Sequence, residues 1–417
     1  MIQRSACVFL RLLSRAPTPP SSCTSKARAG YYGTQATSSL REACESSNYS
    51  RTDDEYADVE WDNLGFGLVQ TDYMYMMMCG RDEEFKQGQL SRYGNIELSP
   101  SAGVLNYGQG LFEGTKAFRR EDGGLFLFRP QENAIRMQIG AQRMCMPCPS
   151  AEQFLDAVKQ TALANRRWIP PPGKGSLYIR PLLMGSGPVL GLAPASEYTF
   201  LVYASPVGNY FKEGIDALNL YVEDEFHRAA RGGAGGVKSI TNYAPVLKAI
   251  ARARDRGFSD VLYLDSVNKR NIEEVSSCNV FIVKGNILST PATNGTILAG
   301  VTRKSIIDIA HDLGYEFCPS RFLNTHIIPS GEGFKELSKF NQVEERSISI
   351  EELINADEVF CTGTAVGVAP VGSITYKGNR IEYKTSTQLV SQKLYSRLTG
   401  IQRGIVKDDR GWVVEID

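Results

Sequence analysis

The stretch GGAGGVKSITNYAPVLKAI, residues 232–250, places a single lysine, Lys238, between a glycine-rich run and a segment with a helical pattern. Most lysines lie on solvated faces of a protein. Three other readings compete with that one: the lysine binds a phosphate, pairs with a buried carboxylate, or acts as a covalent catalyst. A nucleotide-binding P-loop requires G-x-x-x-x-G-K-[ST]. Val237 stands where its second glycine is required, which weighs against that reading.

The covalent reading gains support from three stretches that follow. A lysine that forms a Schiff base with pyridoxal phosphate needs a carboxylate facing the ring nitrogen, and backbone N–H donors for the phosphate. NIEEVSSCNVFIV supplies Glu274 near the start of a strand, and GTILAGVTRKSIIDIA places Val301 and Thr302 at the start of an amphipathic helix. FCTGTAVGVAPV adds a second small turn with the hydroxyl of Thr364. Their order and spacing together favour a pyridoxal phosphate site.

The composition limits the classes of protein to which the chain can belong. The chain has 417 residues, 42% of them hydrophobic and 22% charged, with a formal net charge of zero. This length suits two domains, and the charge balance gives no general attraction to nucleic acid or to an anionic membrane. The sequence has no run of 18 apolar residues, so we expect no transmembrane helix. Its three histidines form no zinc motif, so we expect no metal.

The first fifty residues differ from the rest. Arg4, Arg11 and Arg15 lie among serines and apolar residues, and the first acidic residue is Glu42. An arginine-rich, acid-poor start is typical of an organellar transit peptide. We therefore predict such a peptide over residues 1–50, with a mitochondrial destination and a chloroplast as the alternative.

The remaining chain reads as two α/β halves. We predict a small N-terminal domain over 51–207, an interdomain loop over 208–217 and a large domain over 218–417. The predicted strands are 63–77, a hairpin within 110–130, 176–185, 198–207, 218–224, 259–265 and 277–284; the predicted helices are 131–144, 151–166, 242–256 (capped by Asn242), 302–314 and 384–399.

Seven stretches together resemble the class IV aminotransferases of fold-type IV, specifically the eukaryotic branched-chain amino acid aminotransferases, with plant organellar members nearest in pattern. The resemblance implies an α/β (α+β) fold of two domains, similar to D-amino acid aminotransferase, and pyridoxal 5'-phosphate as the cofactor. The stretches are LNYGQGLFEGTKAF, LFRPQENAIRM, GSLYIRPLL, GGVKSITNYAPV, NIEEVSSCN, ILAGVTRKSI and CTGTAVGVAPV.

The resemblance also assigns roles to individual residues. Lys238 holds the cofactor and moves the α-proton of the substrate, and Glu274 rather than its neighbour Glu273 faces the pyridine nitrogen. Tyr243 lies near the phenolic oxygen of the cofactor. The cofactor phosphate is bound by Arg136, Val301, Thr302 and Thr364.

The implied substrate site must accept both branched-chain amino acids and glutamate. Phe66, Phe112 and Tyr178, together with Tyr243, form an apolar wall. Arg180 lies two residues from Tyr178, on the same face of a strand, and reads the second carboxylate of glutamate. The α-carboxylate is met by the turn at Thr364 and Ala365 and by Tyr107 from the partner subunit of a homodimer.

The implied reaction is reversible amino transfer between leucine, isoleucine or valine and 2-oxoglutarate. Another class IV enzyme, a D-amino acid aminotransferase or an aminodeoxychorismate lyase, fits the motifs around the lysine less well. The alternative from another class is a catalytically inactive paralogue that acts as a binding protein. The intact Lys238, Glu274 and Arg136 weigh against it.

One segment departs from the family pattern. Residues 317–342, FCPSRFLNTHIIPSGEGFKELSKFNQ, stand where family members run almost directly from the equivalent of Glu316 to that of Val343. The segment shows no sustained period of 2 or 3.6 residues. We predict an inserted, poorly ordered surface loop that contributes no site residue.

Overall fold

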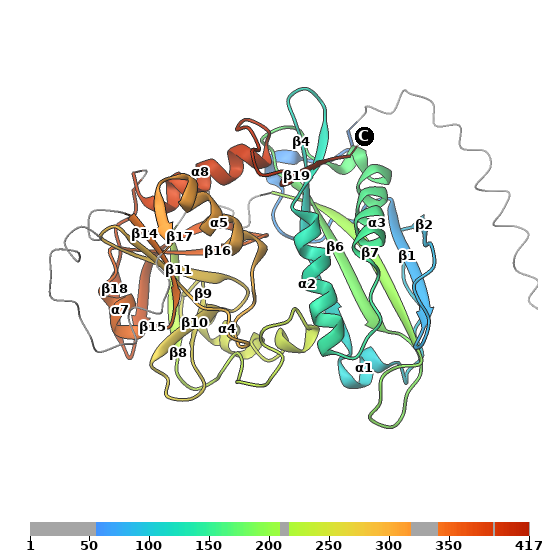
Figure 1. The fold of residues 1–417 in the computed structure, drawn as a ribbon, viewed down its shortest axis with the longest axis horizontal. Helices are drawn as coiled ribbons and strands as arrows, with labels where there is room; N and C mark the ends of the chain where they lie inside the picture. The colour runs from blue at the N-terminus through green and yellow to red at the C-terminus, as the bar shows by residue number, and fades with distance from the viewer. Residues whose placement is uncertain (1–55, 209–216, 318–340, 387, 417) are drawn as a thin grey trace, which may run out of the picture. The chain divides into compact units, whose positions relative to one another are not determined.

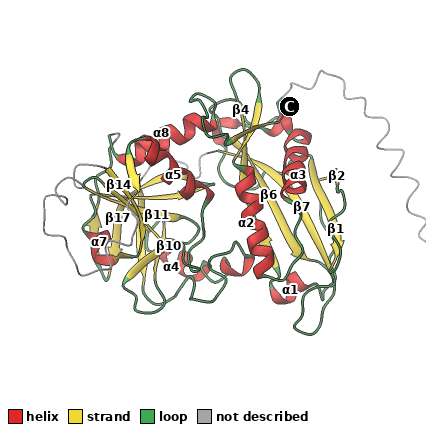
Figure 2. Cartoon of the chain, viewed as in Figure 1, coloured by secondary structure: helices red, strands yellow, loops and turns green. Residues whose placement is uncertain are grey.

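The computed structural model describes residues 56–208, 217–317, 341–386 and 388–416. Their strands form two sheets, one of eight strands and one of eleven (Figures 1 and 2). The predicted transit peptide and most of the predicted interdomain loop lie outside the described residues. The division into a small domain over 51–207 and a large domain over 218–417 therefore stays a proposal.

The first sheet is antiparallel, in the order β19-β5-β4-β6-β7-β1-β2, with β3 beside β6. Helix α3 packs against β1, β6 and β7, and α2 packs against α3 (Figure 1). Ser150 and Gln153 form a capping box that fixes the start of α3. The elements are β1 Tyr73–Gly80, β2 Gln89–Arg92, α1 Gly103–Tyr107, β3 Gly110–Phe112, β4 Thr115–Arg119, β5 Leu125–Phe128, α2 Pro130–Arg143, α3 Ala151–Ala164, β6 Ser176–Gly185, β7 Glu197–Val207 and β19 Val413–Glu415.

The second sheet closes on itself. Strand β10 pairs with β9 on one side and with β11 on the other, so that β11, β16, β17, β8, β9 and β10 form a ring of six strands. The pair that joins β10 to β11 is Glu274 with Asn279. A closed ring leaves no free edge between these strands, and its apolar side chains are buried.

Helices α5 and α8 pack against strands β16 and β17 of this ring. Among the described residues, no helix is long and apolar enough to cross a membrane. The elements are β8 Leu218–Glu223, α4 Leu247–Asp255, β9 Asp260–Leu264, β10 Asn271–Val275, β11 Asn279–Lys284, β12 Ile287–Pro291, α5 Val301–Asp312, β13 Tyr315–Phe317, β14 Asn341–Arg346, β15 Ile348–Ser349, α7 Ile350–Ile354, β16 Glu358–Gly363, β17 Gly367–Tyr376, β18 Asn379–Glu382 and α8 Val390–Gln402.

Most predicted elements are present, and three bounds were wrong. The strand predicted at 63–77 is β1, which begins only at Tyr73. The helix predicted at 384–399 begins at Val390. The helix predicted at 242–256 begins at Leu247, after Pro245, so Asn242 does not cap it. The Asn242 side chain instead donates hydrogen bonds to the carbonyls of Ala234 and Val237, 2.7 and 2.9 Å away.

The segment predicted as an inserted loop has strands at both of its ends. Residues 318–340 lie outside the described residues, but Phe317 belongs to β13, and Asn341 and Gln342 belong to β14. The prediction of a loop over all of 317–342 was therefore wrong at its ends. Strands β13 and β14 are parallel neighbours, with Tyr315 opposite Asn341 and Glu316 opposite Gln342.

This register predicts that a deletion of 317–342 is tolerated. When Glu316 is joined to Val343, Tyr315 and Glu316 can take the places of Asn341 and Gln342 beside β12, because the two strands run in the same direction. We expect that the activity implied by the resemblance, leucine transamination, is unchanged and that the melting temperature is unchanged or higher. Calorimetry and activity assays measure both.

The matched control joins Phe317 to Asn341 and so removes only 318–340. Neighbouring parallel strands need a connection of about a dozen residues or more. This variant must give up β13, and its melting temperature should fall below that of the first variant. An aggregated product from the first deletion would contradict the prediction.

Candidate active site

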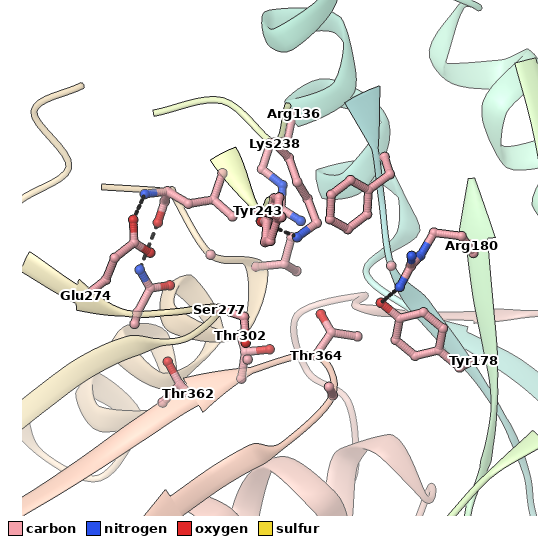
Figure 3. Close-up of a pocket in the computed structure, with 18 of the residues that line it drawn as sticks. Arg136, Tyr178, Arg180, Lys238, Tyr243, Glu274, Ser277, Thr302, Thr362 and Thr364 are labelled. Carbon is pink, nitrogen blue, oxygen red and sulfur yellow. Dashed lines mark hydrogen bonds between the residues drawn. The ribbon is translucent and has the colours of Figure 1, made fainter. Parts of the chain in front are cut away.

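A cavity of about 540 Å³ is lined by residues of both sheets (Figure 3). Strand β3 of the first sheet is linked to the segment that carries Lys238 close to this cavity, because the Phe112 amide donates to the Lys238 carbonyl over 3.2 Å. Among the predicted site residues only Tyr107 does not line the cavity. Those that do are Phe66, Phe112, Arg136, Tyr178, Arg180, Lys238, Tyr243, Glu274, Val301, Thr302, Thr364 and Ala365.

Lys238 points into this cavity between two aromatic rings. Its Nζ donates a hydrogen bond to the Tyr243 hydroxyl, 3.0 Å away. The same Nζ lies 4.3 Å from the centre of the Phe112 ring. These contacts hold the amine at one place and leave two of its N–H groups for a ligand.

The glycine run before Lys238 allows the chain to pass close to another segment. A Cβ atom at Gly235 would lie 2.5 Å from the Thr296 carbonyl oxygen and 2.4 Å from the Ala229 Cβ. Any larger residue would therefore push the two segments apart. The glycines let the loop lie against the segment just before α5, which brings Lys238 near the α5 N-terminus.

Glu274 lies at the pair of residues that closes the ring of strands, and its side chain is 2% exposed. Its Oε1 accepts hydrogen bonds from Arg228 Nη1 over 2.5 Å and from the Leu298 amide over 3.0 Å. Burial raises the pKa of Glu274 to about 7, and the guanidinium of Arg228 opposes that rise. Glu273 does not line the cavity and instead accepts a hydrogen bond from the Thr296 hydroxyl.

Arg136 reaches the cavity from α2 and is oriented by a buried carboxylate that the sequence analysis missed. Glu113 accepts hydrogen bonds from Arg136 Nε over 2.8 Å and from Nη2 over 2.6 Å. Arg136 Nη1 donates to the Ala299 carbonyl over 3.0 Å. One N–H on each terminal nitrogen remains, so a planar edge of the guanidinium is available to an anion.

The N-terminus of α5 adds anion-binding groups beside Arg136. Within the part of the chain that the structure describes, no side chain caps this helix, so the amides of Val301 and Thr302 keep the unpaired character of a first helical turn. A Cβ at Gly300 would lie 2.1 Å from Asn279 Oδ1, so a larger residue there would displace the Asn279 side chain. Thr362 is buried, and its hydroxyl has no hydrogen-bond partner among the described residues.

The part of the cavity wall next to the first sheet is aromatic and contains one positively charged side chain, that of Arg180. The rings of Phe66 and Tyr178 meet edge to face, with centres 5.1 Å apart. Arg180 lies over the Phe112 ring at 4.8 Å and donates to the Tyr178 hydroxyl over 3.3 Å. Its Nε is buried without a hydrogen-bond partner within the described ranges.

Three polar residues near the cavity were missed because only the folded chain brings them there. Arg228 contacts Glu274, Glu113 contacts Arg136, and Tyr203 stands directly opposite Arg180 across strands β6 and β7. The partners in these pairs are separated by 46, 23 and 23 residues. No spacing rule for one helix or one strand covers such separations, so a single sequence offers no signal for them.

Comparison with known proteins places this site in a family. The family model for class IV aminotransferases matches residues 110–326. The chain is 64% identical over 386 residues to a chloroplastic branched-chain-amino-acid aminotransferase 2 of Arabidopsis thaliana, covering 93% of each chain. It is 62% identical over 382 residues to a mitochondrial branched-chain amino acid aminotransferase 1 of Humulus lupulus, covering 92% of this chain and 90% of that one. The chain therefore belongs to the class IV aminotransferases.

Solved structures show the same fold. The branched-chain amino acid aminotransferase of Escherichia coli matches with a TM-score of 0.66 and 25% identity, over 84% of this chain and 100% of that one. The branched-chain aminotransferase of Thermoproteus uzoniensis with norvaline matches with a TM-score of 0.66 and 26% identity, over 83% of this chain and 100% of that one.

The residues in the cavity fit pyridoxal phosphate. The remaining N–H groups of Arg136 and the amides at the start of α5 would bind the phosphate. Glu274 would face the ring nitrogen, and Lys238 would hold the aldehyde carbon. A planar molecule with an anionic group at one end and a basic nitrogen on its ring thus has a partner for each polar group.

Proposed function

We propose that the protein is a branched-chain-amino-acid transaminase that uses pyridoxal 5'-phosphate. It transfers an amino group reversibly between leucine, isoleucine or valine and 2-oxoglutarate. The observation that carries this proposal is that a single cavity joins Lys238, Glu274 and the anion-binding end of α5 to an aromatic wall with one cation, Arg180.

When bound, pyridoxal phosphate supplies an aldehyde for the amino group and a ring that withdraws electrons from the α-carbon. Lys238 Nζ holds the cofactor and then carries a proton to and from the α-carbon. Glu274, held in place by Arg228 and the Leu298 amide, keeps a proton on the ring nitrogen. Tyr243 orients Lys238 through its hydroxyl, and Arg136, Val301, Thr302 and Thr364 bind the phosphate.

The cavity accounts for two kinds of substrate side chain. Phe66, Phe112 and Tyr178 offer an apolar surface for a branched aliphatic group. Arg180 offers charged donors for the second carboxylate of glutamate or 2-oxoglutarate. The turn at Thr364 and Ala365, between strands β16 and β17, lines the cavity and binds the α-carboxylate of the substrate.

The absorption spectrum of the purified protein tests the proposal. The band of the lysine-bound cofactor should shift when leucine is added and should return when 2-oxoglutarate follows. The chain is also 48% identical over 368 residues to a methionine aminotransferase of Arabidopsis thaliana. Methionine is therefore the control substrate, and a clear preference for methionine over all three branched-chain amino acids would contradict the proposal.

We predict that Arg180→Met lowers kcat/KM for glutamate and 2-oxoglutarate much more than kcat/KM for leucine. Hydrogen bonds to charged groups contribute about 1.5–3 kcal/mol, so the loss in kcat/KM for 2-oxoglutarate should be roughly 10- to 100-fold. The loss for leucine should be severalfold at most, because leucine has no second carboxylate. Steady-state kinetics with each substrate in turn separates the two. Equal losses would identify a structural arginine.

The active form is a homodimer in this proposal. Tyr107 is 40% exposed, and its hydroxyl donates to the carbonyl of Leu190, which is 90% exposed. Leu105 and Leu192 add further exposed apolar surface to these elements. Such a surface suits burial against a second copy, which brings Tyr107 to the partner's cavity. Sedimentation analysis of the holoenzyme tests the dimer, and a monomer with full activity would contradict it.

The enzyme is organellar in this proposal, with the mitochondrion as its destination. Similar proteins are named for chloroplasts and for mitochondria. The arginine-rich, acid-poor composition of residues 1–50 favours the mitochondrion. A fusion of residues 1–50 to a fluorescent protein tests this, and plastid fluorescence would contradict the mitochondrial choice.

A further inference from the structure

One lysine other than Lys238 lies close to the substrate end of the cavity. Lys116, on β4, donates a hydrogen bond from its Nζ to the carbonyl of Ala365, 3.2 Å away. Ala365 belongs to the short turn between β16 and β17, which lines the cavity. Lys116 itself does not line the cavity. The bond therefore ties the first sheet to a turn of the ring, 249 residues away in sequence.

The ammonium of Lys116 forms no ion pair with any residue that the structure describes. Among the described residues, no carboxylate oxygen lies within 4.0 Å of its Nζ. Burial lowers the pKa of Lys116 to about 8, so most of the side chain still carries its charge at neutral pH. The Lys116 side chain is half-buried, and an ammonium with a single carbonyl partner in such a place favours a nearby negative charge.

The amino-acid substrate brings that negative charge to this turn. Lys116 lies opposite Tyr178 across strands β4 and β6, so the two side chains leave the same face of the first sheet. This is the face that meets the Thr364–Ala365 turn. When Ala365 O is held by Lys116, the peptide groups of the turn keep one orientation. The positive charge also favours an anion at the turn.

We propose that Lys116 is the positioning residue for the α-carboxylate of the substrate. It fixes the Thr364–Ala365 turn through the Ala365 carbonyl and supplies the countercharge that this carboxylate meets on binding. This inference rests on the proposed function, because it assumes that an amino acid occupies the cavity. It concerns recognition of the group that all α-amino acids share, and leaves side-chain selection to the aromatic wall and Arg180.

The test compares two analogues of leucine, each of which lacks one of the two charged groups of the amino acid. 4-Methylvalerate is leucine without its amino group, and isoamylamine is leucine without its carboxylate. Both are titrated into the holoenzyme as inhibitors, with wild-type protein, Lys116→Met and Lys116→Arg. In Lys116→Met, binding of 4-methylvalerate should weaken about tenfold, the effect of one unit charge several ångströms from a carboxylate in a partly buried site. The KM for leucine should rise similarly, while kcat, cofactor content and isoamylamine binding stay within about twofold.

Lys116→Arg keeps the charge and a donor, and should restore most of the 4-methylvalerate affinity. Lys393→Met, on the exposed side of α8, removes one positive charge elsewhere and should change nothing. Wild-type binding of 4-methylvalerate by Lys116→Met would overturn the inference, as would equal weakening of the acid and the amine. If wild-type protein does not process leucine, the proposed function fails instead, and the comparison is made with the amino acid it does accept and that amino acid's deaminated analogue.

Discussion

Lys238→Ala is expected to bind pyridoxal phosphate only non-covalently and to lose nearly all transamination. In the proposed function, the amine that holds the cofactor also moves the α-proton, and no other lysine of the described residues lines the cavity. Loss of a positioned proton-transfer group alone costs about 10²–10⁴-fold in rate. Single-turnover assays with leucine measure the remaining activity. Lys238→Arg is the matched control, because it keeps the positive charge beside Phe112 and cannot form the covalent link.

Borohydride reduction followed by peptide mapping identifies the lysine directly. The reagent converts the link between the cofactor and its lysine into a stable amine, so the label should be found on the peptide that contains Lys238. A label on any other lysine would reject the assignment.

The same variant tests whether Tyr107 contributes to the partner's site in the proposed dimer. When Lys238→Ala is mixed and refolded with Tyr107→Ala, a hybrid dimer contains one site with both Lys238 and a partner Tyr107. Activity above that of either parent is expected from the mixture. Purely additive activity would contradict a tyrosine supplied by the partner subunit.

Glu274→Gln is expected to keep much of the bound cofactor and to lower kcat by about 10²-fold or more, the scale of losing a preorganised charge. An ionised carboxylate stabilises a protonated ring nitrogen by direct charge pairing, whereas an amide does not. In addition, the neutral side chain leaves Arg228 without its ion-pair partner. Stopped-flow absorbance with leucine separates the chemical step from binding.

Glu273→Gln is the matched control for this prediction. Glu273 is the preceding residue on β10 and is also buried, with 7% exposure, but its side chain contacts Thr296 outside the cavity. We expect less than a tenfold change in kcat, because no charge at the cofactor is altered. A large loss in Glu273→Gln with little loss in Glu274→Gln would reverse the assignment of the two carboxylates.

The sequence predicted what depends on local pattern. Helix α5 and strand β6 follow from their periods and flanking residues, and their bounds were predicted to within two residues. Lys238, Glu274 and Arg136 each lie in a motif that reads along the chain, and all three line one cavity. These are places where local preference and the final fold agree.

What the sequence did not predict depends on pairing between distant segments. The Arg228–Glu274 pair, the Glu113–Arg136 pair and the Lys116–Ala365 bond all cross between elements that only the folded chain brings together. The closure of the ring at Glu274 and Asn279 is of the same kind. A single sequence carries no record of which strands become neighbours, so charge partners that lie on different strands stay hidden.

The first sheet cannot be completed until most of the chain has been translated, because its outer strand β19 is formed by Val413–Glu415. This strand pairs with β5, and the amide of Ile416 donates to the Leu125 carbonyl. A ribosome must therefore add residues 129–412 after β5 before that outer strand exists. At roughly 5–20 residues per second, the edge of β5 is unpaired on the nascent chain for tens of seconds. During this interval it is a ready site for a chaperone or for mispairing with a neighbouring nascent chain.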